Sequence, residues 1–179
     1  MEEGPLSGFS AFILAIPLAG VPPSPEHLAL SPDGKTAYVA SPPTDQVFVL
    51  DVPARRVLRT LPVQGRPSFV LPVRWGRALL VSCRYGSQVA VLDPRSGKTL
   101  RSFKTGAEPV GLALSADQTV LYVVQSQEDS VLALDFSSGK KIWEAAVGHE
   151  PRFSALASEG QVLVVSNGLS RDVALLNAR

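Results

Sequence analysis

Residues 109–150 read PVGLALSADQTVLYVVQSQEDSVLALDFSSGKKIWEAAVGHE, and this stretch decides the fold. It holds four short apolar runs that polar turns separate, and it leads into a Gly-x-x-Pro exit. Short runs rich in valine and leucine, bounded by Ser, Asp and Gly, predict β-strands. The stretch is therefore predicted to be one complete four-stranded unit.

The same unit recurs along the chain with an unbroken spacing of 42 residues. The leading proline of each copy follows this step: Pro25, Pro67, Pro109 and Pro151. The residue that closes each third run follows it too: Asp51, Asp93, Asp135 and Asn177. A fixed period in the forties with four β-runs per unit is typical of propeller blades. We therefore expect an all-β chain, a β-propeller of four 42-residue blades.

The apolar pattern within a unit predicts how each strand is covered. Residues 120–125 and 130–135 are nearly continuous apolar runs, as in strands that neighbouring blades cover on both faces. The fourth run, residues 141–146, mixes charged and apolar side chains, which is typical of an exposed outer edge. Asp93 and Asp135 precede Ser-Gly turns, so we expect their carboxylates to form Asx turns.

The two ends of the chain suggest how the blades are completed. The fourth copy stops after its third run, and residues 16–19 lie 42 positions before residues 58–61 of the first copy. We expect the N-terminal run to supply the missing strand and close the ring. The alternative is that four blades form half of a larger ring, which two chains could complete as a homodimer. The predicted organisation is a flexible tail over residues 1–8 and a propeller domain over 9–179, with blades at 25–66, 67–108, 109–150, and 151–179 completed by about 12–24.

The repeat resembles a known family. Tyr38-Val39-Ala40-Ser41 and Val47-Phe48-Val49-Leu50-Asp51, followed by a turn and Gly-x-x-Pro, are similar to the YVTN-type β-propeller repeat. The resemblance covers about residues 12–179, and of the four copies only the last keeps the motif's asparagine, Asn167. It implies a propeller fold and an asparagine that bonds the following loop. Larger propellers that resemble this family include lactone hydrolases and redox enzymes.

Composition narrows the classes of partner and compartment. The chain has 179 residues, of which 45% are hydrophobic and 18% charged, and its net charge is +1. No basic stripe appears, so nucleic acid is not an expected partner. The single cysteine, Cys83, excludes a disulfide framework, and its place at a strand end favours a packing role.

The apolar run at residues 9–21 has two interpretations, a secretory signal or a displaced strand. Glu2 and Glu3, with no Lys or Arg before the run, disfavour the signal, and the run is too short to span a bilayer. The sequence thus predicts no transmembrane segment. It slightly favours the cytoplasm, and an extracytoplasmic location stays open.

Loops on one face of the propeller carry the candidate site. They vary between copies while the strands do not, and loops commonly carry function on a rigid scaffold. We predict that a ligand or partner is recognised at the mouth of the central channel. The candidate binding residues are Arg66, Arg84, Tyr85, Glu108, Gln125, His149, Glu150 and Asn167.

The sequence offers no catalytic constellation. The two histidines, His27 and His149, cannot build a three-histidine metal site, and adjacent His149 and Glu150 point apart in an extended chain. We expect no catalytic residue, metal or cofactor. The favoured function is a non-catalytic binding or interaction scaffold for a protein or small molecule. The alternative is a hydrolase similar to lactonases, a redox propeller enzyme, or a fragment of one.

Overall fold

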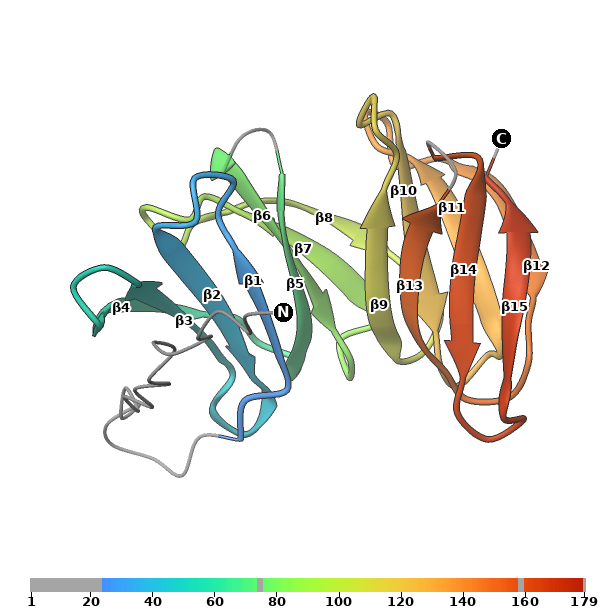
Figure 1. Cartoon of the computed structure of the whole chain (residues 1–179), viewed down its shortest axis with the longest axis horizontal. Coiled ribbons are helices and arrows are strands. Elements are labelled where there is room, and N and C mark those ends of the chain that lie inside the picture. Colours follow the sequence, from blue (N-terminus) through green and yellow to red (C-terminus); the bar gives the residue numbers. More distant parts are fainter. Residues whose placement is uncertain (1–23, 74–75, 158–159, 179) are drawn as a thin grey trace, which may run out of the picture.

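The computed structural model describes residues 24–73, 76–157 and 160–178, and these form four antiparallel sheets in chain order (Figure 1). The first blade has a short 3-10 turn at Pro42–Thr44 and four strands: β1 (His27–Leu30), β2 (Thr36–Ser41), β3 (Gln46–Asp51) and β4 (Arg56–Pro62). The strands of the second are β5 (Pro67–Val73), β6 (Ala78–Cys83), β7 (Gln88–Leu92) and β8 (Thr99–Lys104). The third contains β9 (Pro109–Leu114), β10 (Val120–Gln125), β11 (Ser130–Asp135) and β12 (Lys141–Ala146). The fourth contains β13 (Pro151–Ala157), β14 (Val162–Asn167) and β15 (Asp172–Asn177).

Each sheet is a simple antiparallel meander in which successive strands are neighbours. The order is β1-β2-β3-β4 in the first blade, the second and third blades repeat it, and the described part of the fourth has the order β13-β14-β15. The first strand of each blade lies innermost, and β1, β5, β9 and β13 contact one another in sequence order. The prediction of an all-β propeller with 42-residue blades is confirmed by this arrangement. The strand expected from about residues 12–24 and the tail at residues 1–8 lie outside the described residues.

The turn aspartates behave as the sequence predicts. The Asp51 carboxylate accepts a hydrogen bond from the backbone N–H of Ala54 at 2.9 Å, and that of Asp93 accepts one from Arg95 at 2.8 Å. Asp135 accepts one from Ser138 at 2.6 Å. These bonds replace backbone pairing where the chain reverses, and they are the mark of Asx turns. These aspartates therefore stabilise the turn between the third and fourth strands of their blades.

The hydrophobic core is divided into layers between successive blades. One cluster joins the first and second blades through residues such as Val49 and Leu92. A second joins the second and third blades through Val91 and Leu134, and a third joins the third and fourth blades. Among the described residues, no cluster contains members of both the first and the fourth blade. Each blade is therefore held by apolar contacts with the blade before or after it in the sequence.

Two outer-strand arginines also bridge neighbouring blades. Arg59 donates from Nη1 to the Arg95 carbonyl at 2.6 Å, and Arg101, one period later, donates to the Ser137 carbonyl at 2.8 Å. The Arg101 guanidinium carbon lies 4.5 Å from the ring centre of Phe103, close enough for a cation–π interaction.

The described residues contain no helix long and apolar enough to cross a membrane.

Candidate functional site

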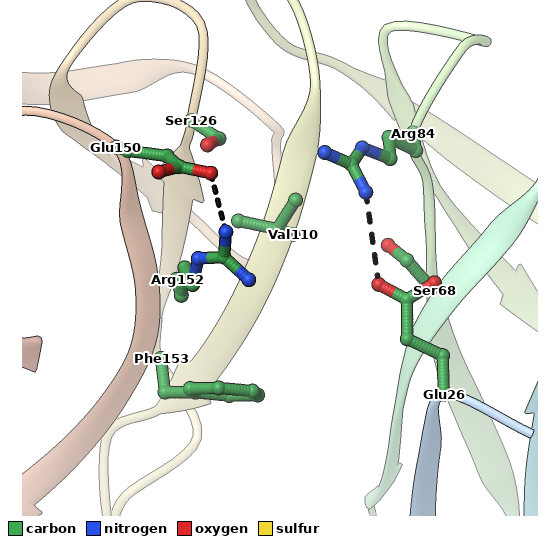
Figure 2. A pocket seen from close by; sticks show the side chains of 8 residues that line it. All are labelled: Glu26, Ser68, Arg84, Val110, Ser126, Glu150, Arg152 and Phe153. Carbon is green, nitrogen blue, oxygen red and sulfur yellow. Dashed lines mark hydrogen bonds and ion pairs between the residues drawn. The ribbon is translucent and has the colours of Figure 1, made fainter. Parts of the chain in front are cut away.

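A polar pocket lies beside the inner strands and the loops next to them (Figure 2). Its empty space is about 380 Å³, part of which is open to solvent. All four blades contribute to its wall. The lining residues are Glu26, Ser68, Arg84, Val110, Ser126, Glu150, Arg152 and Phe153.

Half of this lining comes from one repeat position. The residue directly after the leading proline of each blade faces the pocket, and the four copies are Glu26, Ser68, Val110 and Arg152. The backbone position is the same, while the side chains are an acid, a hydroxyl, an apolar group and a base. The sequence prediction missed these residues because it searched loops and not the first residues of strands. The position after each leading proline was the available signal.

Two ion-pair groups stand on opposite sides of the pocket. Arg84 pairs with Glu108 at 3.0 Å and reaches Glu26 at 3.8 Å, while Arg152 pairs with Glu150. Figure 2 shows the two guanidinium groups on either side of Val110. Partly exposed pairs of this kind contribute about 0–1 kcal/mol to stability. They can therefore exchange partners with a charged ligand at little cost to the fold.

The loops that frame the pocket hold three residues in a left-handed conformation. Arg66, Glu108 and Glu150 each precede a leading proline and have φ of 57°, 50° and 54°. The carboxylates of Asp45 and Asp129 each accept the backbone N–H of one of them, Arg66 and Glu150 respectively, at 2.8 Å. Left-handed non-glycine residues are strained, so these bonds stabilise the loop shape. The positive φ falls in each case on the residue directly before the leading proline.

Gln125 and Asn167 lie beneath these loops and are buried. The side-chain oxygen of Gln125 accepts the backbone N–H of Gly106 at 2.6 Å, and its amide group donates to Glu144 at 2.8 Å. The amide of Asn167 donates to the carboxylate of Asp172, the first residue of β15, at 2.7 Å across the intervening loop. Both side chains hold loops in place and do not line the pocket.

The other predicted residues lie on the exposed rim. The Arg66 guanidinium carbon lies 4.9 Å from the centre of the Tyr85 ring, and Tyr85 is 61% exposed. His149 Nδ1 lies 2.6 Å from the Asp129 carboxylate. This hydrogen bond, together with the backbone N–H of Glu150, lowers the pKa of Asp129. Of the eight predicted residues, Arg84 and Glu150 line the pocket, and Glu108 pairs with Arg84. Arg66, Tyr85 and His149 are exposed and outside the lining, while Gln125 and Asn167 are buried.

The side chains around the pocket are charged, polar and aromatic. In the described part of the chain, no group of three His, Cys, Asp or Glu side chains could hold a metal ion. Burial raises the pKa of the Cys83 thiol to about 11, so the reactive thiolate is not populated at neutral pH. The pocket offers two arginines, two glutamates and an exposed phenylalanine, and Glu108 pairs with one of the arginines, Arg84. These groups bind by ion pairing, hydrogen bonding and stacking.

Comparison with known proteins places the chain among β-propellers. A family profile described as outer membrane protein assembly factor BamB matches residues 85–178. No curated protein sequence matches the chain.

Three solved structures show the same fold at low identity. Hydrazine synthase from Kuenenia stuttgartiensis matches with a TM-score of 0.79 and 22% identity, over 95% of this chain and 49% of that one. A structure of the mitotic checkpoint complex matches with a TM-score of 0.74 and 20% identity, over 84% and 48%. A putative 6-phosphogluconolactonase from Bacteroides uniformis matches with a TM-score of 0.71 and 19% identity, over 87% and 53%. The chain spans about half the length of these structures.

Proposed function

The chain belongs to the family described as outer membrane protein assembly factor BamB, and on this premise we propose that it is a non-catalytic β-propeller scaffold that recognises a partner at the channel mouth. The observation that carries the proposal is the pocket in which each blade presents a different side chain at one repeat position. An asymmetric lining on a symmetric backbone suits a ligand that offers different groups on different sides. Catalysis has no comparable support in the described residues.

The chemistry of the mouth favours a polypeptide ligand. Arg84 and Arg152 can pair with carboxylates, while Tyr85 and Phe153 are large, exposed aromatic side chains. Arginine and tyrosine are enriched among residues that dominate protein interfaces. The family description names an assembly factor, which also points to a protein partner. We propose a peptide segment that carries both acidic and apolar residues.

A displayed random-peptide library tests this proposal. Peptides selected on the parent chain are expected to bind Arg84→Ala and Arg152→Ala at least about tenfold more weakly, because each substitution removes a charged contact. Thermal melts should remain close to the parent, since substitutions at exposed sites usually stay within about 0.5 kcal/mol. Lys35→Ala lies in the turn between β1 and β2, at the opposite end of the blade, and serves as the matched control.

Two experimental outcomes would contradict the proposed scaffold function. Peptide binding that survives both arginine substitutions but is lost in Lys35→Ala places recognition on the opposite face. A hydrolytic or redox activity of the purified chain that disappears in His149→Ala, while the fold survives, establishes the enzyme alternative.

A further inference from the structure

The fourth blade presents an exposed apolar face. We call the side chains of Phe153, Val164, Val173 and Leu175 the open face of blade four. Phe153 is 55% exposed, Val173 59% and Leu175 69%. The strand register places Val164 opposite Leu175, so the residues are contiguous on one side of the sheet. Contiguous exposed apolar surface of this kind marks an interaction site in a soluble protein.

The same repeat positions are buried in every other blade. The counterparts of Val173 are Val47, Val89 and Val131, each 0% exposed. The counterparts of Leu175 are Val49, Val91 and Ala133, none of which is more than 4% exposed. In those blades the next blade covers the face. The open face of blade four is therefore half of a repeating interface whose other half is missing in the described residues.

The first blade shows the complementary half. Leu28 and Leu30 on β1 are 63% and 54% exposed, and we call them the open face of blade one. Val70 and Leu112, which are the counterparts of Leu28, are at most 2% exposed because they pack against the preceding blade. Farther out on the same side of blade one, Phe48 is buried in a small cluster of that blade. The open part of this face thus lies next to the channel.

Charge also matches across these two faces. Glu26 and Arg152 occupy the same repeat position, directly after the leading proline, in the first and fourth blades. The equivalent residues of adjacent blades lie side by side around the pocket. A fourth blade set against a first blade therefore brings an arginine next to a glutamate, and opposite charges favour that register.

We propose that a second copy of this chain docks head to tail, with the open face of blade four of each copy on the open face of blade one of the other. Two such interfaces close a ring of eight blades around a shared channel. The contact continues the interface that already joins the first three pairs of blades, and no cluster of described residues makes it within one copy. Such an arrangement closes because both copies use both faces.

The solution mass of the 179-residue chain tests the proposal. Light scattering coupled to size-exclusion chromatography is expected to give twice the 19.0-kDa chain mass. Leu175→Arg and Leu28→Arg should each raise the dimer dissociation constant at least about tenfold, because each puts an unpaired charge into an apolar contact. Leu100→Arg, at an exposed position of β8 outside both faces, is the matched control and should remain dimeric. Circular dichroism confirms that the variants fold.

Mixing the variants tests the head-to-tail arrangement. An equimolar mixture of Leu28→Arg and Leu175→Arg chains should recover dimers, because one of the two interfaces then joins two unaltered faces. A face-to-face dimer would be disrupted by Leu175→Arg alone and would leave Leu28→Arg dimeric. That result, a parent mass of 19.0 kDa at high concentration, or dimers that survive both substitutions would each overturn the proposal.

Discussion

At the scale of single residues, the carboxylate of Asp135 closes the turn between β11 and β12. One of its oxygens accepts hydrogen bonds from the Ser137 hydroxyl at 2.7 Å and from the Ser138 backbone N–H at 2.6 Å. These bonds, the Ser137 hydroxyl first, lower the pKa of Asp135 from 3.8 to about 2. The folded state therefore binds this proton less tightly than the unfolded state does.

The lowered pKa of Asp135 predicts an acid-dependent loss of stability. Its contribution is fully present above pH 3.8 and is lost as the pH falls toward about 2, since the unfolded state then gains a proton that the folded state does not. Asp135→Asn should melt at a lower temperature at pH 6 and show a flatter dependence between pH 4 and pH 2. Thermal melts across this range measure both effects. Parallel curves for parent and variant would contradict the assignment.

Cys83 is expected to be unreactive in the folded chain. Its side chain is fully buried and its pKa is raised to about 11, so a thiol reagent at pH 8 meets neither an accessible nor an ionised group. A colorimetric thiol assay should detect no thiol in native protein and one per chain in guanidinium. A Cys83→Ser chain that carries Tyr85→Cys provides the control, because position 85 is exposed and should react without denaturant.

The turn aspartates could be predicted from the sequence, whereas the burial of Gln125 could not. The turn role of Asp93 and Asp135 follows from local chemistry with the serine and glycine that come next, and it was predicted. The burial of Gln125 was not predicted, because a polar side chain at the end of a strand is usually exposed unless specific hydrogen-bond partners are known. Those partners, Gly106 and Glu144, are 19 residues away on each side of it, a distance that a repeat pattern does not resolve.

At the scale of the strand, β7 illustrates how one element serves two layers of core. Val89 and Val91 pack toward the third blade, while Ala90 and Leu92 pack toward the first. This alternation explains why the sequence of β7 is an almost unbroken apolar run and why its strand character was predictable. The contribution of the inner strands to the pocket was harder to predict, because it depends on a single position in each blade, the residue directly after the leading proline.

Val91→Asp should unfold the domain. Val91 is 4% exposed between the second and third blades, where an unpaired carboxylate costs several kcal/mol against a total stability of about 5–15 kcal/mol. Circular dichroism and a thermal melt are expected to show no cooperative transition near the parent midpoint. Leu100→Asp, one strand away in β8 but exposed, should melt close to the parent. A cooperative melt of Val91→Asp near the parent midpoint would show that β7 is not interior.

At the scale of the whole molecule, the proposed pairing of two copies ties stability to concentration. Binding of a second copy to the folded chain alone raises the melting temperature as concentration increases. The parent should therefore melt several degrees higher at 100 µM than at 1 µM, as an order-of-magnitude expectation from mass action. Leu175→Arg should remove most of this dependence. A parent midpoint that does not change with concentration would contradict the pairing.

The layered core has a further consequence for how the chain folds during synthesis. Within the described residues, every sheet is built from one contiguous segment, and each hydrophobic cluster that links two blades links consecutive ones. Contacts that are close in sequence form quickly because little loop entropy is lost. A nascent chain can therefore acquire its structure in order, with the first blade buried against the second before the third emerges from the ribosome. Stability then grows in steps of one blade, as in other repeat arrays.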